Sequence, residues 1–248
     1  MILDYLERLS EATTVDEAWT LLIETMSGFG FDRLLYGFTR FRTARSYGSR
    51  DDVLVLSNHD PEYLKIFIDG GLYAHAPMVK WANENVGACS WSWLYENSLH
   101  LTPIEEKIQD YNRRHRIRAG YSISFKDVSH RAKGAIGLVA RPGLEQSAVD
   151  EMWAEHGRTI VQMNNMAHLK ITSLPFPTGR RPLTPRQREV LEWVGDGKTV
   201  QDIATIMGVS VATVEKHLRL AREALDVETT AQAVLKASFQ NQIFVLAD

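Results

Sequence analysis

The residues best suited to contact a nucleic acid lie in "MGVSVATVEKHLRLAREAL", residues 207–225, whose spacing predicts a helix over 211–225. Apolar side chains recur at helical spacing and predict one buried stripe: Val211, Val214, Leu218, Ala221 and Leu225. The opposite face carries Ala212, Glu215, Lys216, Arg219 and Arg222. In a major groove the basic groups can contact phosphate or guanine, and Glu215 can accept from a cytosine amino group. The alternative is a charged face that is only solvated.

Start and stop signals divide residues 183–248 into four short helices. Three capping pairs precede the first three helices: Thr184–Gln187, Thr199–Asp202 and Ser210–Thr213. Thr229 begins the fourth helix, and Gly208-Val209 forms a tight turn between the second and the third. Packing of the second helix on the apolar stripe leaves the charged face outward, as in a helix-turn-helix. The net charge of this part of the chain does not distinguish a DNA-contacting face from a solvated one, because residues 179–248 hold nine basic and nine acidic side chains.

The segment "LTPRQREVLEWVGDGKTVQDIATIMGVSVATVEKHL" resembles the DNA-binding domain of the LuxR family. The matched positions are Leu183-Thr184, Arg186, Leu191, Trp193, Gly197-Lys198-Thr199, Ile203-Ala204, Thr213-Val214 and His217. The family usually has glutamate where Gln187 stands. Glutamine can still close the capping box, although it loses a favourable charge at the helix N-terminus, so we expect a modest effect.

This resemblance implies that Glu215 and Arg219 contact bases and that neighbouring residues contact the DNA backbone. The DNA-binding candidates are Lys198, Thr199, Ser210, Thr213, Glu215, Lys216, Arg219 and Arg222. The expected partner is double-stranded DNA with a roughly palindromic operator, bound by a homodimer whose half-sites lie about one helical turn apart.

Helix and strand patterns are mixed in the first 171 residues. Capping boxes at Thr14–Glu17 and Thr102–Glu105 predict two helices, the second extending to about Arg114, and an amphipathic pattern predicts a long helix over 146–171. The stripe of the long helix is Val149, Trp153, His156, Ile160, Met163 and Ala167. Strand patterns cover residues 34–41, 53–57, 120–126 and 134–141, the last two as a hairpin. The long helix could equally be core or dimer surface.

These patterns predict an α+β chain. They indicate a sheet flanked by helices over residues 1–171 and a four-helix helix-turn-helix domain over residues 183–248. Residues 172–182 contain three prolines and a glycine and predict a linker. A phosphate-receiving domain is the alternative for the first part, with Asp51-Asp52 as its acidic pair. We do not expect it, because no apolar strand precedes that pair and the elements do not alternate as βα units.

The stretch "HDPEYLKIFIDGGLYAHAPMVKWANENVGACSW" resembles the autoinducer-binding domain of the quorum-sensing branch of the LuxR family. In that branch the domain binds an acyl-homoserine lactone within an α/β/α sandwich, so the resemblance implies that residues 1–171 form a ligand-sensing α/β/α sandwich. Pro77 matches the proline of an Asp-Pro pair, Trp91 matches a tryptophan that lines the lactone end, and Gly120 matches a glycine that begins the hairpin. The order of helices, strands, linker and DNA-binding domain agrees over the whole chain.

Three departures fall at the polar anchors of that site. Tyr63 stands where a tryptophan donates to the lactone carbonyl, Phe67 where a tyrosine bonds the acyl carbonyl, and Ala76 where an aspartate receives the amide proton. Each lost partner costs about 1–3 kcal/mol when the ligand group is buried. The pocket could therefore bind a less polar or aromatic signal, Tyr73 or His75 could replace the missing groups, or the domain could fold without ligand.

We favour a small-molecule signal held in an aromatic cavity, either an acyl-homoserine lactone or an aromatic or apolar analogue. The ligand-binding candidates are Tyr36, His59, Tyr63, Phe67, Tyr73, Ala76, Trp91 and Ser122. Trp81 and Trp93 could also line the cavity, although ordinary core packing is the alternative for every aromatic residue. His59 and His75 are more typical of structural or surface groups than of ligand contacts.

Composition excludes several other classes. The net charge of −3 and the apolar content of 44% are those of a globular protein, and no apolar run is long enough to span a membrane, so we expect a cytoplasmic protein.

The single cysteine excludes an internal disulfide. An enzyme would need Cys89 to pair with His75 or His100, and no spacing fixes that geometry. We predict no catalytic residue, no cofactor and no metal. The alternatives left are a ligand-independent regulator, a response regulator and a cysteine enzyme.

Overall fold

The computed structural model describes residues 2–43, 52–96, 101–127, 129–175 and 182–244. The chain forms two compact units, Met1–Ile171 and Thr172–Asp248. Helix α7 (Gln146–Ser173) continues into the range predicted as a linker, and residues 176–181 of that range lie outside the described residues. The long helix was thus predicted correctly, with its end placed slightly too early.

The first unit is built on a five-stranded antiparallel sheet. Its strands are β1 (Phe31–Thr39), β2 (Val53–Ser57), β3 (Gly87–Ser90), β4 (Gly120–Ser124) and β5 (Lys133–Ala140). Their order across the sheet is β2-β1-β5-β4-β3, so the predicted hairpin of β4 and β5 is confirmed. Strand β3 was not predicted, because it is short and its Gly-Ala-Cys-Ser sequence carries no strand pattern.

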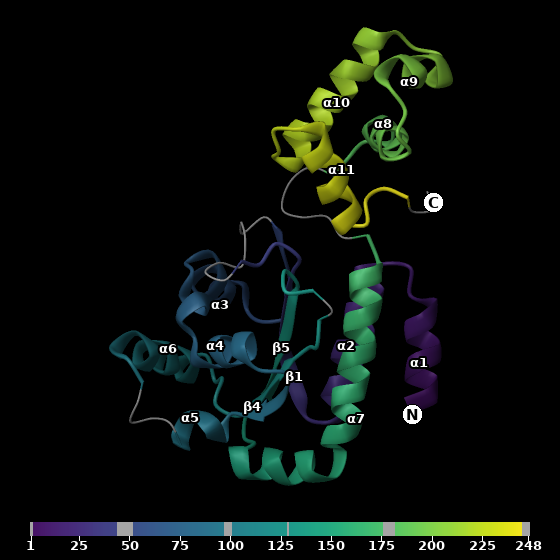
Figure 1. Cartoon of the computed structure of the whole chain (residues 1–248). Coiled ribbons are helices and arrows are strands. Elements are labelled where there is room, and N and C mark those ends of the chain that lie inside the picture. Colours follow the sequence, from purple (N-terminus) through teal and green to yellow (C-terminus); the bar gives the residue numbers. More distant parts are fainter. Residues whose placement is uncertain (1, 44–51, 97–100, 128, 176–181, 245–248) are drawn as a thin grey trace. The chain divides into compact units, whose positions relative to one another are not determined.

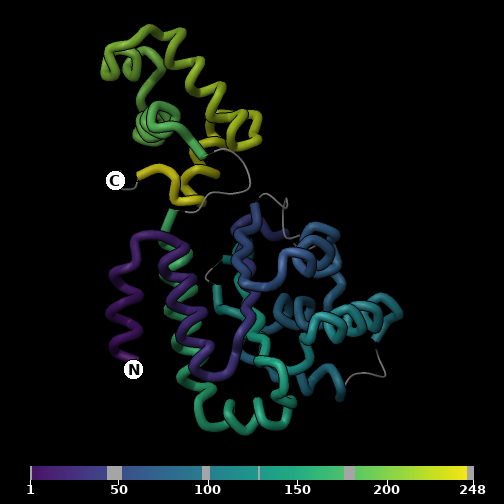
Figure 2. The backbone as a smooth tube through the Cα atoms, turned by 180° about the vertical axis from the view of Figure 1, so that it is seen from behind, coloured from purple at the N-terminus to yellow at the C-terminus, as the bar shows by residue number. Residues whose placement is uncertain are grey.

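Helices cover both faces of this sheet, which confirms the predicted sandwich (Figure 1). The first face carries α1 (Ile2–Glu11), α2 (Val15–Gly28) and α7. The second face carries shorter elements: α3 (Pro61–Leu64), a π-helical turn η2 (Lys65–Asp69), a 3₁₀ turn η3 (Leu72–His75), α4 (Pro77–Glu84), α5 (Ser92–Glu96) and α6 (Pro103–Arg114). The view from behind shows the same two layers on either side of the strands (Figure 2).

Local signals placed the longer helices well. The Glu17 carboxylate accepts from the backbone N–H of Thr14, and the Glu105 carboxylate from that of Thr102, so both predicted capping boxes form. On α7 the predicted stripe is buried at Val149, Ile160, Met163 and Ala167. Trp153 and His156 are only half-buried, which corrects the stripe at those positions. The Trp153 ring stacks on Tyr121 with centroids 3.7 Å apart.

The second unit contains the four predicted helices, α8 (Pro185–Gly195), α9 (Val200–Met207), α10 (Val211–Leu225) and α11 (Thr230–Phe239). The Gln187 side chain accepts from the Thr184 N–H at 2.9 Å, so glutamine closes this capping box as expected. Gly208 ends α9 in the left-handed conformation (φ 65°) that the tight turn requires. The apolar stripe of α10 is buried at Val214, Leu218, Ala221 and Leu225, whereas Val211 is only partly buried.

Candidate functional site

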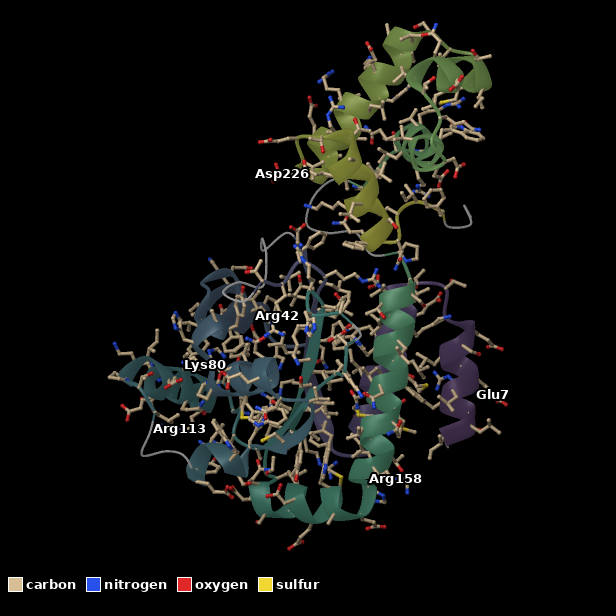
Figure 3. All side chains as sticks on the ribbon, viewed as in Figure 1. Glu7, Arg42, Lys80, Arg113, Arg158 and Asp226 are labelled. Carbon is tan, nitrogen blue, oxygen red and sulfur yellow. The ribbon has the colours of Figure 1, made fainter. Side chains whose placement is uncertain are left out.

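A cavity of about 540 Å³ lies in the first unit, between the sheet and the layer of helices from α3 to α6. That volume is within the range of small-molecule sites. All eight sequence-predicted ligand residues line it: Tyr36, His59, Tyr63, Phe67, Tyr73, Ala76, Trp91 and Ser122. Figure 3 shows Lys80 and Arg113 on this layer of helices and Arg158 on the opposite layer. The structure thus brings together residues from four strands and from most of the helices of that layer.

Tyr36 lines the cavity differently from the prediction. Its ring packs against Trp19, Phe125 and His168, which belong to the α2 and α7 side of the sheet. Its hydroxyl bonds the Nδ1 atom of His168 at 2.8 Å. Because successive side chains of a strand point to opposite faces, the neighbour Leu35 faces the pocket layer and Tyr36 faces away. The Tyr36 ring therefore packs on the α2 and α7 side of the sheet, and a ligand contact of this residue stays a prediction.

Tyr63 lies at the centre of an aromatic stack. Its ring stacks on His59, Phe67 and Tyr111, with centroids 4.9, 5.1 and 5.4 Å away. The Tyr63 hydroxyl donates to Oδ1 of Asn112 at 3.0 Å. The donor that could have served a ligand carbonyl is therefore held by a neighbouring side chain, although both residues line the cavity.

Two of the three anchor positions have no polar side chain. Phe67 and Ala76 are each 5% exposed and line the cavity. Tyr73 also lines it and is half-buried, whereas His75 is exposed and lies outside the lining, so His75 does not replace a missing anchor. Trp81 and Trp93 are not lining residues either, which corrects that expectation.

The Trp91 end of the cavity keeps a polar pair. The indole Nε1 donates to Oγ of Ser122 at 3.0 Å, and both side chains are buried. Gly120 makes this contact possible: a Cβ atom there would lie 2.1 Å from the carbonyl oxygen of Leu138 and 3.0 Å from the Trp91 ring. The glycine that marks the start of the hairpin is thus required by close packing of strand on strand and on the indole.

His59 is buried more deeply than a surface histidine would be, with 7% of its surface exposed. Burial, together with the positive charge of Arg33, lowers the pKa of His59 to about 4, so the ring is neutral at physiological pH. Its Nε2 atom is buried and has no hydrogen-bond partner in the described part of the chain. A neutral ring with one unused nitrogen in the cavity wall is suited to bond a ligand.

This environment predicts a pH dependence of folding. The folded pKa of His59 lies below the unfolded value of about 6.5, so the stabilisation is complete above pH 6.5 and is lost as the pH falls toward 4. When the pH falls from 7 to 5, we expect the unfolding free energy of the wild type to drop by about 2 kcal/mol more than that of the His59→Gln variant. Urea unfolding of each protein at pH 7 and at pH 5 measures this difference. The matched control is His75→Gln at an exposed histidine, and equal pH slopes for all three proteins would contradict the assignment.

Several lining residues were missed by the sequence analysis. They include Asn83, Tyr95, Asn112, Arg113 and Lys133. Asn83 lies within the aromatic segment 59–91 and Tyr95 shortly after it, whereas Asn112, Arg113 and Lys133 lie on later elements, and no motif marks any of the five. Only the packing of α4, α5, α6 and β5 around one space identifies them.

The charged face of α10 is exposed, as the helical spacing predicted. Ala212, Glu215, Lys216 and Arg219 are exposed, while Val214 on the opposite side is fully buried. The buried stripe packs on a core that includes Ile203 and Ala204 of α9 and residues of α8 and α11. The arrangement is that of a helix-turn-helix formed by α9 and α10, in which the charged face of α10 is exposed.

The helix starts are also accessible. Ser210 Oγ accepts from the Thr213 N–H at 3.2 Å and caps α10, and the Thr199 hydroxyl caps α9 in the same way through Asp202. Ser210, Thr199 and Lys198 are exposed, and Thr213 is half-buried. Thr199 and Ser210 therefore cap their helices and remain accessible, and the contact of these four residues with a DNA backbone stays a prediction.

The two arginines of α10 differ in their surroundings. Arg219 is more than half exposed, and its one ion pair among the described residues is with Glu223 on its own helix, at 2.5 Å. Such a surface pair contributes only about 0–1 kcal/mol and is easily exchanged for a base. Arg222 is half-buried and donates to the Thr230 hydroxyl at the start of α11, at 3.0 Å. Arg222 therefore joins two helices, whatever it contacts on DNA.

The thiol that the enzyme hypothesis needs is not activated. Burial raises the pKa of the Cys89 thiol to about 11, so the thiol is protonated and weakly nucleophilic at neutral pH. His100 lies outside the described residues. Across residues 2–43, 52–96, 101–127, 129–175 and 182–244, no cluster of three or more His, Cys, Asp or Glu could hold a metal ion. In the same portion of the chain, no helix has the length and apolarity of a membrane span.

The fold and the two sites define a transcription regulator with a small-molecule pocket. Residues 14–171 match the family model described as autoinducer binding domain, and residues 181–237 match that of bacterial regulatory proteins, luxR family. The chain therefore belongs to the LuxR-type quorum-sensing transcriptional regulators. It is not an enzyme, and its first unit is an autoinducer-binding domain, which excludes the response-regulator alternative.

Relatives extend over most of the chain. The transcriptional activator LuxR of Aliivibrio fischeri is 22% identical over 191 residues, covering 76% of this chain and 74% of LuxR. AhyR of Aeromonas hydrophila is 24% identical over 241 residues, covering 95% of this chain and 89% of AhyR. Among solved structures, SdiA in complex with octanoyl-rac-glycerol has a TM-score of 0.54 at 16% identity, with 99% of this chain and 96% of SdiA covered. CepR2 of Burkholderia cenocepacia has a TM-score of 0.55 at 19% identity, with 68% of this chain and 92% of CepR2 covered. These two likenesses show the fold.

Proposed function

We propose that this regulator responds to a mainly apolar or aromatic signal that lacks the amide of an acyl-homoserine lactone. The observation that carries the proposal is the pair of buried apolar residues Phe67 and Ala76 in the pocket wall. A lactone bound in the usual pose would bury an amide N–H opposite Ala76 and a carbonyl opposite Phe67. Each unpaired group costs about 1–3 kcal/mol, and the Tyr63 hydroxyl, already bonded to Asn112, does not compensate.

The type of ligand seen in one fold neighbour supports this choice. SdiA has been solved with octanoyl-rac-glycerol, an ester with free hydroxyl groups and no amide. A sandwich of this kind can thus hold an amphiphile without the amide anchor. A cavity of about 540 Å³ lined mostly by apolar side chains also favours a ligand over folding without one.

We further propose that the protein acts as a cytoplasmic homodimer on a roughly palindromic operator. In each subunit α10 enters one half-site, with Glu215 and Arg219 at base edges and Lys198, Thr199, Ser210, Thr213, Lys216 and Arg222 near the backbone. The exposed charged face and the buried opposite stripe of α10 support this role. The signal changes the affinity of this dimer for DNA.

Thermal unfolding of the full chain tests the ligand proposal. We expect 1-octanoyl-rac-glycerol to raise the melting temperature at a concentration at least about tenfold below that needed for octanoyl-homoserine lactone, because the lactone loses two partners. Ala76→Asp restores an acceptor, so this variant should gain lactone stabilisation and should not gain stabilisation by the ester. Native mass spectrometry of the purified protein reports dimer and any retained molecule together. Equal stabilisation of the wild type by lactone and ester would overturn the proposal.

A further inference from the structure

Two buried polar atoms in the wall of the cavity have no hydrogen-bond partner among the described residues. One is Nε2 of His59 and the other is Oδ1 of Asn83. Buried polar atoms in proteins are nearly always bonded, so two unbonded atoms on residues that line one cavity indicate groups that a ligand satisfies. This inference rests on the proposed binding of a small molecule in the pocket and specifies its chemistry.

His59 lies at one end of the sheet segment that forms the cavity floor. Its backbone N–H donates to Oγ of Ser57 at 3.1 Å, and Ser57 is paired with Leu35 of β1. The His59 ring stacks on Tyr63, which belongs to the same end. The free nitrogen is therefore placed beside the Leu35 end of the cavity.

Asn83 lies at the opposite end. It is near the C-terminal end of α4, where the neighbouring Ala82 carbonyl accepts from Ser124 Oγ at 2.7 Å. Lys133, which is paired with Thr39 of β1, donates through Nζ to the carbonyl of Asn85 at 3.0 Å. Leu35 and Thr39 are four positions apart on β1, so about 13 Å of strand lies between the two ends.

The atoms at the Asn83 end define the group they would bind. An amide oxygen only accepts, so Oδ1 of Asn83 needs a donor on the ligand. The ammonium of Lys133, which also lines the cavity, has donors beyond the one given to Asn85. A hydroxyl group satisfies both, because it can donate to Asn83 and accept from Lys133. Between the ends the floor is apolar or backbone, at Leu35, Gly37 and Ala135.

We infer that the pocket takes an elongated apolar molecule with a hydrogen-bonding group at each end, one at His59 and a hydroxyl at Asn83. The middle of such a ligand is held by apolar contact with the aromatic stack and the floor of the sheet. An acyl-homoserine lactone with a plain alkyl tail leaves the Asn83 end unpaired. The inference therefore predicts a different ligand class from a molecule that is polar at one end only.

The test compares 1-nonanol with 1,9-nonanediol, whose extended length matches the distance between the ends. Binding to the full-length wild-type protein is measured by titration calorimetry. We expect the diol to bind about three- to tenfold more tightly, which is the gain from one added hydrogen bond. If Asn83 held no ligand group, the second hydroxyl would be buried without a partner, and the diol would bind at least about fivefold more weakly. Whether the diol binds more tightly or more weakly than 1-nonanol therefore decides whether Asn83 bonds a ligand group.

Two variants locate the effect. Asn83→Leu should convert the preference for the diol into a preference for 1-nonanol, while 1-nonanol itself binds within about twofold of the wild-type affinity. The control is Gln109→Leu, which removes another polar lining side chain, on α6, and should keep the preference for the diol. Melting curves check that each variant is folded.

The outcomes separate the two proposals. Binding of 1-nonanol without a preference for the diol overturns the second polar end and leaves the apolar pocket intact. A preference for the diol that survives Asn83→Leu also overturns the assignment. Binding of neither alcohol to the wild type contradicts the two-ended ligand and the apolar signal alike.

Discussion

Arg219→Ala lowers the affinity for the specific operator by about 5- to 150-fold while binding to random-sequence DNA changes much less. The expected loss corresponds to about 1–3 kcal/mol for one bidentate contact with a base. Arg219 can make such a contact, because its ion pair in the described part of the chain is with Glu223 on the same exposed helix face. The stability of the fold should be unchanged, since the side chain is more than half exposed.

Fluorescence anisotropy with an operator duplex and a scrambled duplex, at one fixed salt concentration, measures both affinities. The matched control is Arg222→Ala, the other arginine of α10. Because Arg222 donates to Thr230 of α11, its loss should weaken binding to both duplexes by a similar factor and lower the melting temperature. Equal losses on the two duplexes for Arg219→Ala would show that Arg219 contacts only phosphate.

Leu218→Ala truncates one of the two buried leucines that α10 contributes to the core of the second unit. Leu218 is 5% exposed and packs with Val214, Ala221 and residues of the neighbouring helices. Truncation of a buried leucine costs about 2–5 kcal/mol, from lost transfer free energy and the cavity left behind. Since small domains have only about 5–15 kcal/mol of stability, we expect a large part of the DNA-binding affinity to be lost at 37 °C.

The same substitution at an exposed leucine provides the control. Leu235 on α11 is 52% exposed, so Leu235→Ala should change the unfolding free energy by no more than about 0.5 kcal/mol. Urea unfolding of the full chain, followed by circular dichroism and by operator binding, separates the two variants. A loss below 1 kcal/mol for Leu218→Ala would mean that α10 is not packed on α9 as described.

Local signals in the sequence were sufficient for the second unit. Capping boxes and glycine stops act within a few residues, so they set the limits of α8, α9 and α10 without help from distant contacts. The apolar stripe then specified which face is buried, because a helix repeats every 3.6 residues whatever surrounds it. Only Val211, at the first turn of α10, is more exposed than its place in the stripe suggested.

For the sensing domain the sequence determined the three longest helices, four of the five strands and the chemistry at three anchor positions. The absence of polar groups at Phe67 and Ala76 follows from residue type alone. The tertiary structure decided which way Tyr36 faces, because the pleat of β1 and its pairing set the side of the sheet that each residue occupies. It also decided that His59 and Asn83 share one cavity. Residues from separate elements meet only when the chain packs, and no local rule of spacing encodes that meeting.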